Sequence, residues 1–124
     1  MLLLDTSVLI DVLRGSEPAS IWLASANELP ICSELTRAEV LRGVRSAERS
    51  RTERLLGSLR WAPVDEPVSR RAGELGREYR RSHPGLSIVD LAIAATAELL
   101  GAELATANVR HYPMFAGLVP PYAL

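Results

Sequence analysis

The chain has 124 residues, of which 48% are hydrophobic and 23% are charged, with a formal net charge of −1. These proportions are typical of an ordinary globular domain and exclude a collagen-like repeat, a disordered chain and a disulfide scaffold. The length fits one domain, residues 1–124, which is large enough to fold without cross-links. All 14 basic residues are arginine. A GC-rich coding sequence explains this bias, and so does selection for the planar guanidinium group, which pairs with phosphate through two parallel hydrogen bonds.

The sequence carries no sign of a membrane segment or of a secretion signal. Its apolar runs fall short of the roughly 20 consecutive residues that cross a bilayer. Asp5 interrupts the first run, and no basic residue precedes it, so the N-terminus does not resemble a signal peptide. The single cysteine, Cys32, permits no intramolecular disulfide and is expected to be a buried small hydrophobe. We therefore expect a cytoplasmic protein without a membrane partner.

The hydrophobic pattern predicts strands that alternate with helices. Short apolar runs indicate buried strands, and apolar residues spaced three or four apart indicate helices. The expected elements, in chain order, are a strand over 1–4, helices over 8–13 and 18–26, a strand over 29–32, helices over 35–44 and 47–59, a strand over 61–64, helices over 68–79 and 87–100, a strand over 103–106, and a tail that is irregular or an edge strand. This alternation predicts an α/β fold around a mostly parallel sheet.

Four polar side chains stand near the junctions between predicted strands and helices. Asp5 directly follows the first strand, and Asn108 follows the last. Glu39 and Asp90 lie in the first turns of two predicted helices. Because parallel sheets bind ligands beyond the carboxyl ends of their strands, these four residues are candidates for one site. Carboxylates that converge repel one another, and a hard cation such as Mg²⁺ or Mn²⁺ relieves the repulsion and activates water for phosphoryl chemistry.

Each candidate also has a purely structural interpretation. Asp5 would cap the N-terminus of a helix. The spacings from Thr36 to Glu39 and from Ser87 to Asp90 both fit a capping box, in which the acidic side chain reaches back to the N-cap. The asparagine fits a turn. Spacing alone leaves these interpretations open beside the metal site.

Four ordered stretches of the sequence carry a family resemblance. They are LLDTSVLI over 3–10, SELTRAEV over 33–40 with Gly43, SIVDLAIAATA over 87–97 and LATANVRHY over 104–112. Together they resemble the motifs of PIN-domain ribonucleases, and more closely those of VapC-type toxins from type II toxin–antitoxin systems. One such stretch alone would be weak evidence, but four in order over a chain of the family's usual length are specific.

The resemblance implies a PIN-like three-layer sandwich, with a mostly parallel central sheet flanked by helices. It also implies a metal-dependent endoribonuclease, in which Asp5, Glu39 and Asp90 hold Mg²⁺ or Mn²⁺. Asn108 would complete the catalytic set at a position where many relatives have aspartate, and its missing charge implies weaker metal binding. Hydroxyl side chains would hold the carboxylates in place: Thr6, Ser7 and Thr106.

The resemblance further implies a substrate and partners. Metal-activated water would hydrolyse structured RNA, such as transfer RNA or ribosomal RNA, and leave a 5′-phosphate and a 3′-hydroxyl. Relatives are commonly homodimers, and each is neutralised by a cognate VapB-type antitoxin whose C-terminal segment covers the site. Three arginines are candidates for contacts with RNA phosphates, although a solvated helix face explains such residues equally well: Arg42, Arg45 and Arg110.

Two other functions stay open at the level of the sequence. A catalytically weak PIN-like binding module is supported by the missing fourth acid at Asn108. A phosphohydrolase of the haloacid-dehalogenase type also begins with an aspartate after a strand, but it usually needs a second aspartate where this chain has Ser7. Glu34 competes with Glu39 as a ligand. Asp11 is expected on a solvated face, with an approach to the edge of the acidic cluster as the alternative. His83 and His111 are too few and too separated to predict a zinc site.

Overall fold

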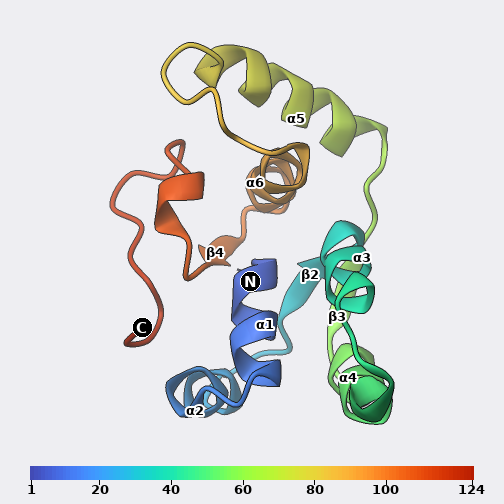
Figure 1. Ribbon diagram of the computed structural model, residues 1–124. Helices are drawn as coiled ribbons and strands as arrows, with labels where there is room; N and C mark the ends of the chain where they lie inside the picture. The colour runs from blue at the N-terminus through green and yellow to red at the C-terminus, as the bar shows by residue number, and fades with distance from the viewer.

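A four-stranded, all-parallel sheet forms the centre of the protein (Figure 1). The computed structural model describes residues 1–124. The strands are β1 (Leu2–Leu4), β2 (Ile31–Ser33), β3 (Arg60–Ala62) and β4 (Glu103–Ala105), and they lie in the order β3-β2-β1-β4. In this register Leu3 lies between Ile31 and Leu104. The predicted parallel sheet is confirmed, and the first strand lies between the second and the last.

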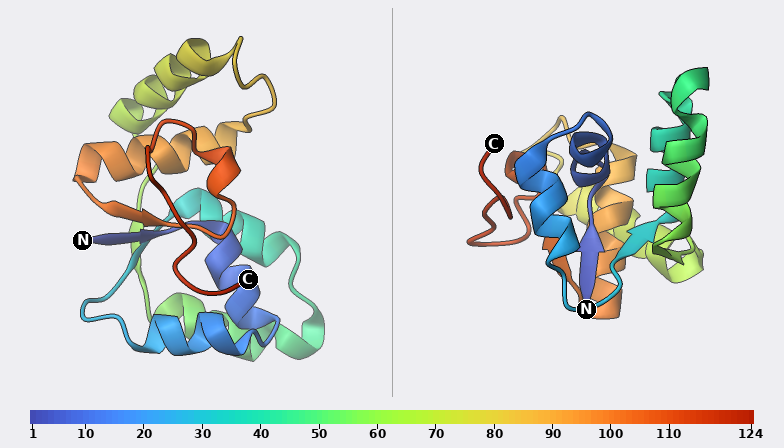
Figure 2. Two further views of the ribbon diagram at one scale, coloured as in Figure 1. Left: turned by 90° about the vertical axis from the view of Figure 1, so that its left-hand side faces the viewer. Right: turned by 90° about the horizontal axis from the view of Figure 1, so that it is seen from below.

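Helices cover both faces of the sheet, so the predicted three-layer α/β architecture is confirmed. Figure 2 shows α5 and α6 on one side, and α1, α2 and α4 on the other. No helix is both long and apolar enough to cross a membrane. The helices are α1 (Thr6–Leu13), α2 (Glu17–Ala24), α3 (Glu34–Arg42), α4 (Arg49–Gly57), α5 (Glu66–Tyr79) and α6 (Ile88–Leu100), with short 3₁₀ turns η1 (Ser46–Glu48) and η2 (Val109–His111).

Successive side chains of β1 point to opposite faces and enter two separate hydrophobic cores. Leu3 is fully buried in the core beneath α6, together with Ile93. Leu4 is fully buried on the other face, where Leu9 of α1 and Leu56 of α4 surround it. Strand β1 therefore packs against the helices on both faces of the sheet. Because its last residue, Leu4, is buried in this way, the next residue, Asp5, has a fixed position.

Helix α6 is buried along most of its length because it lies between the sheet and α5 (Figure 1). Residues Leu91 to Ala97 are all buried. A helix that is apolar all round is stable only in such a sandwiched position. The neighbouring helix approaches closely at Gly76, where an added Cβ would lie 3.2 Å from the Leu91 side chain. Gly101 ends α6 in the left-handed conformation, with φ at 64°.

Several predicted boundaries differ from the structure. The arginine-rich helix predicted over 47–59 divides into η1 and α4, because the Glu48 carboxylate accepts a hydrogen bond from the backbone N–H of Arg45 and closes a separate turn. Strand β3 ends at Ala62 and not at residue 64, since Pro63 has no N–H to donate to a neighbouring strand. The tail forms no strand and is irregular after η2.

The burial of α6 generates a prediction about stability. Replacing Ile93, which is 0% exposed, with alanine should lower the free energy of unfolding by about 2–5 kcal/mol. The substitution removes buried methyl and methylene groups and leaves a cavity that the packed neighbouring elements cannot fill. Urea unfolding would measure the loss. Ile88→Ala, on the same helix but 66% exposed, is the matched control and should cost under about 0.5 kcal/mol. Equal losses for both variants would contradict the proposed role of α6.

Candidate active site

The carboxyl end of the sheet opens into a polar pocket of about 480 Å³. Strands β1 and β4 and the N-terminal turn of α6 all end or begin there. The structure places all four sequence-predicted catalytic residues on this one pocket. The lining residues are Asp5, Thr6, Ser7, Ile10, Asp11, Arg14, Glu39, Gly85, Ser87, Asp90, Ala107, Asn108 and His111.

Asp5 forms the buried floor of the pocket and is only 3% exposed. It is also the N-cap of α1, as its structural interpretation predicted. Its Oδ2 accepts hydrogen bonds from the hydroxyls of Ser7, over 2.6 Å, and Thr106, over 2.8 Å. Its Oδ1 accepts one from the hydroxyl of Tyr112, over 2.7 Å. A carboxylate buried this deeply is tolerated only because both oxygens have partners.

The two hydroxyls on Oδ2 are themselves fixed by the backbone that follows β4. The backbone N–H of Ala107 donates to Ser7 Oγ over 3.0 Å, and that of Asn108 donates to Thr106 Oγ1 over 2.9 Å. The loop after β4 is thereby tied to the first turn of α1. Asp5 cannot rotate without breaking this network, so its orientation is set before any ligand arrives.

Glu39 enters the pocket from the middle of α3. Its Oε1 accepts a hydrogen bond of 2.6 Å from the hydroxyl of Thr6, which also lies 3.0 Å from Thr36 Oγ1. The predicted capping box between Thr36 and Glu39 is wrong, because α3 begins at Glu34 and Ser33 is its N-cap. The glutamate is therefore free of a capping role.

Asp90 enters from the first turn of α6. Ser87 caps this helix by accepting a hydrogen bond from the Asp90 N–H over 3.1 Å. The serine half of the predicted capping box is thus present, while the Asp90 carboxylate meets the Tyr112 hydroxyl at 3.4 Å and His111 Nδ1 at 3.1 Å. Burial raises the pKa of Asp90, and the negative charge of Asp5 raises it further, against a lowering by Ser87, His111 and Tyr112.

The remaining predicted residues lie at the rim or outside. Asn108 is exposed on the pocket lining. Of the two possibilities for Asp11, the structure shows the approach to the acidic cluster, since Asp11 lines the pocket and accepts a hydrogen bond of 2.7 Å from the Tyr122 hydroxyl. The competing acid Glu34 points elsewhere and pairs with Arg37 over 2.7 Å. Burial raises the pKa of Cys32 to about 12, which suits its expected role as an inert hydrophobe.

The arginines predicted to contact RNA are all exposed: Arg42, Arg45 and Arg110. Arg45 lines a second hollow of about 370 Å³ beside the polar pocket. Arg14 lines both hollows and is exposed between them. Sequence reasoning missed Arg14, although a signal existed. Thr6, Ile10 and Arg14 are spaced four residues apart, so they share one face of α1 and its C-terminal end.

The donor set of the pocket fits a hard divalent cation. Asp5 Oδ1 and Asp90 Oδ1 converge on the same Tyr112 hydroxyl, and Glu39 and Asn108 line the same pocket. These groups offer oxygen ligands, as Mg²⁺ and Mn²⁺ prefer. No three acidic, histidine or cysteine side chains are grouped tightly enough to hold an ion as they stand. Asp5 is held in place by its hydrogen bonds, so binding of an ion requires the side chains of Glu39 and Asp90 to move toward it.

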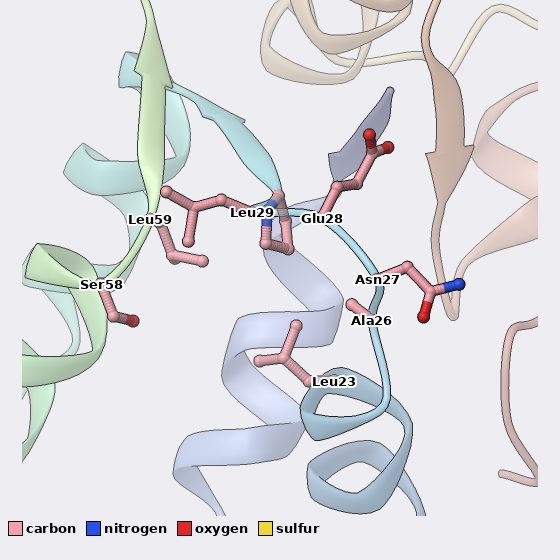
Figure 3. A pocket seen from close by; sticks show the side chains of 8 residues that line it. Leu23, Ala26, Asn27, Glu28, Leu29, Ser58 and Leu59 are labelled. Carbon is pink, nitrogen blue, oxygen red and sulfur yellow. The ribbon is translucent and has the colours of Figure 1, made fainter.

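A hollow at the opposite end of the sheet lacks such chemistry (Figure 3). It has a volume of about 370 Å³ and lies before β2 and β3, at their amino ends. Leu23, Leu29 and Leu59 line it, and its one carboxylate, Glu28, pairs with the N-terminal amine over 3.0 Å. The reactive groups are therefore concentrated at the carboxyl end of the sheet.

Comparison with known proteins gives this arrangement a family. The PIN domain family model matches residues 2–114. The chain is 47% identical over 126 residues to Ribonuclease VapC10 of Mycobacterium tuberculosis (strain ATCC 25618 / H37Rv), with 100% of this chain and 95% of the relative covered. It is 45% identical over 125 residues to Ribonuclease VapC19 of the same strain, with 98% and 100% covered. The chain therefore belongs to the PIN domain family, and within that family it is of the VapC type.

A solved structure agrees with this assignment. The toxin–antitoxin complex from Klebsiella pneumoniae contains a chain that superposes with a TM-score of 0.85 and 29% sequence identity, covering 100% of both chains. The resemblance seen in the four sequence stretches is confirmed. Membership of this family also makes the haloacid-dehalogenase alternative wrong.

The raised pKa of Asp90 predicts a pH-dependent effect on stability. The folded protein holds a proton on Asp90 more readily than the unfolded chain does, so this group's contribution to stability falls as pH rises through its folded pKa. In chelator, Asp90→Asn should therefore melt at a higher temperature than the parent at neutral pH. The advantage should shrink as pH falls below the range in which carboxyl groups titrate. Melting curves across pH would measure it.

Glu34→Gln provides a control of opposite sign. The hydrogen bond from Arg37 lowers the pKa of Glu34, so this variant should lose a small amount of stability at neutral pH and none in acid. The effect is small because the pair is exposed. An Asp90→Asn variant that is less stable than the parent at neutral pH would contradict the assignment of burial as the dominant cause.

Proposed function

We propose that this chain is a metal-dependent endoribonuclease, the toxin of a toxin–antitoxin pair, which hydrolyses phosphodiester bonds in structured RNA. The observation that carries the proposal is the convergence of Asp5 and Asp90 on one hydroxyl, in a pocket that Glu39 and Asn108 also line. The names of two similar proteins, Ribonuclease VapC10 and Ribonuclease VapC19, support the same activity.

Asp5, Asp90 and Glu39 are the proposed ligands of Mg²⁺ or Mn²⁺, and Asn108 adds a neutral oxygen. A bound ion would supply a Lewis acid that lowers the pKa of a water molecule and offsets the charge that develops on the phosphate. The hydroxyls of Ser7 and Thr106 orient the Asp5 carboxylate, and the hydroxyl of Thr6 orients that of Glu39. Such supporting hydrogen bonds favour metal binding because the ligands need little reorganisation.

The cationic rim would hold the RNA, which an acidic pocket alone would repel. Arg14 stands at the pocket mouth, and Arg42, Arg45 and Arg110 are exposed on neighbouring segments. None of the four forms an ion pair with a carboxylate of this chain. They are therefore available to phosphate groups. Transfer RNA or ribosomal RNA is the proposed substrate class.

A cognate antitoxin of the VapB type is the proposed protein partner. The second hollow is lined by Ile10, Leu13, Val40 and Val44, and it shares Ile10 and Arg14 with the polar pocket. A C-terminal antitoxin segment could place apolar side chains in this hollow and a basic side chain on the carboxylates. The likeness to a chain of a solved toxin–antitoxin complex supports this partner.

We also propose that residues 1–124 act as one PIN-like domain in a cytoplasmic homodimer. The family model over 2–114 and the single shared sheet support the first part. An apolar hollow of about 400 Å³ beside the edge strand β4 supports the second, because a second copy would cover it. Its lining includes Leu2, Trp22, Phe115, Leu118 and Val119.

Isosteric replacement of the ligands tests the nuclease. The purified chain, freed of any bound partner, would be incubated with total cellular RNA in Mg²⁺, in Mn²⁺ and in chelator. We expect discrete fragments that require metal. Asp5→Asn and Asp90→Asn should each reduce cleavage by more than about 100-fold, since loss of a ligand exceeds the 10–100-fold effect of losing a supporting group.

Glu34→Gln is the control for this experiment, because it removes an acid of α3 that lies outside the pocket. Its cleavage should equal that of the parent. Full activity of Asp90→Asn on an RNA that the parent cuts would disprove the site. A parent chain that neither cleaves RNA nor binds Mn²⁺ would favour the catalytically weak binding module instead.

The position of Arg14 generates a separate prediction about RNA binding. Arg14→Gln should weaken RNA binding and lower the slope of log affinity against log salt concentration by about one, because one phosphate contact is lost. Binding would be measured with Asp90→Asn as the background, so that RNA stays intact. Arg70→Gln is the matched control, since Arg70 is exposed on α5 and pairs with Glu66 over 2.9 Å. An unchanged slope for Arg14→Gln would remove Arg14 from the RNA path.

A further inference from the structure

Tyr112 is a buried residue at the candidate site, and the sequence pattern alone indicates no role for it. It follows η2 and is only 1% exposed. Its ring packs in the core beneath α6 and lies 6.3 Å from the ring of Phe115, centroid to centroid. Its hydroxyl leaves this apolar surrounding and reaches Asp5 and Asp90. Packing explains the ring but does not explain the hydroxyl.

The Tyr112 hydroxyl lies at unequal distances from the carboxylates of Asp5 and Asp90, and the difference shows which of them accepts its hydrogen bond. A phenol carries one proton and can donate it to one acceptor at a time. The 2.7 Å contact with Asp5 Oδ1 is a full hydrogen bond, whereas the 3.4 Å contact with Asp90 Oδ1 is long. The hydroxyl therefore fixes Asp5 and stands between the two anions, which would otherwise repel each other directly.

The hydrogen bonds to the Asp5 carboxylate leave its Oδ1 open to a further ligand. Oδ2 receives the hydroxyls of Ser7 and Thr106, and these occupy its lone pairs. Oδ1 receives only Tyr112, so one lone pair stays unused. Because Asp90 Oδ1 meets the same hydroxyl, the unused lone pair belongs to the oxygen of Asp5 that is close to Asp90.

We propose that Tyr112 is a positioning residue for the metal-binding carboxylates: its hydroxyl holds Asp5 so that Oδ1 and the Asp90 carboxylate are both presented to one divalent cation. This inference rests on the proposed metal-dependent function. Phenylalanine would fill the same core volume but would leave Oδ1 without its donor. Supporting groups of this kind change metal affinity by about 10–100-fold.

The test compares Tyr112→Phe with the matched control Tyr122→Phe. Both tyrosines donate a 2.7 Å hydrogen bond to an aspartate, but the partner of Tyr122 is Asp11, which is not a proposed ligand. Calorimetric titration of the metal-free proteins with Mn²⁺ should show affinity lowered about tenfold or more in Tyr112→Phe. Tyr122→Phe should match the parent. RNA cleavage by Tyr112→Phe should recover at high Mn²⁺ concentration, which a loss of packing would not produce.

The outcomes separate the two proposals. A parent chain that binds no Mn²⁺ overturns both the metal site and the role of Tyr112. A parent that binds Mn²⁺, with Tyr112→Phe binding equally well, overturns the role of Tyr112 alone. Melting curves in chelator would establish that the variant is folded.

A second measurement keeps the hydroxyl and so does not depend on the variant folding. The chain contains three tyrosines, so replacing all of them with 3-fluorotyrosine gives three ¹⁹F signals. Tyr79→Phe and Tyr122→Phe assign the signals by elimination. Titration with Mg²⁺ should shift the Tyr112 signal and leave that of Tyr79 unchanged, since Tyr79 packs against His83 and not against a site carboxylate. A Tyr112 signal that does not move while Mg²⁺ binds would overturn the proposal.

Discussion

The buried charge of Asp5 is the constraint on which the rest of the site depends. An unpaired carboxylate in this position would cost several kcal/mol, so the fold must bring donors to it. Those donors come from separate parts of the chain: Ser7 from α1, Thr106 from the residue after β4, and Tyr112 from the residue after η2. The C-terminal segment must therefore fold against β1 if the buried carboxylate of Asp5 is to receive its hydrogen bonds.

Capping a helix and binding a metal ion do not exclude each other at the N-termini of α1 and α6. The Asp5 carboxylate accepts the Ser7 N–H as an N-cap and still has one oxygen with an unused lone pair. At α6 the two tasks are divided, since Ser87 caps the helix and the carboxylate of Asp90 faces the pocket. The N-terminus of a helix favours negative charge, so the same position suits an N-cap and an anionic ligand held ready for a cation.

Much of this arrangement could be predicted from the sequence, because it follows from local patterns. Alternating apolar runs predict the parallel sheet, and a parallel sheet brings residues such as Asp5 and Asn108 to one edge. Tyr112 could not be found this way, since its reach depends on how η2 turns the chain back toward β1. The division of the 47–59 helix also escaped prediction. It depends on one hydrogen bond from Arg45 to Glu48, which competes with a continuous helix.

The charges of the site explain why a cation and the RNA would bind together. Asp5, Glu39 and Asp90 line a pocket that must accept a phosphodiester, which is also an anion. Without a cation, repulsion opposes every approach of the substrate, even with Arg14 at the mouth. Asn108 lowers this repulsion by one charge compared with an aspartate, and in the proposed metal site it would also hold the cation less strongly. In the proposed complex the phosphate would be a further ligand of the cation, so that metal and substrate would each raise the affinity for the other.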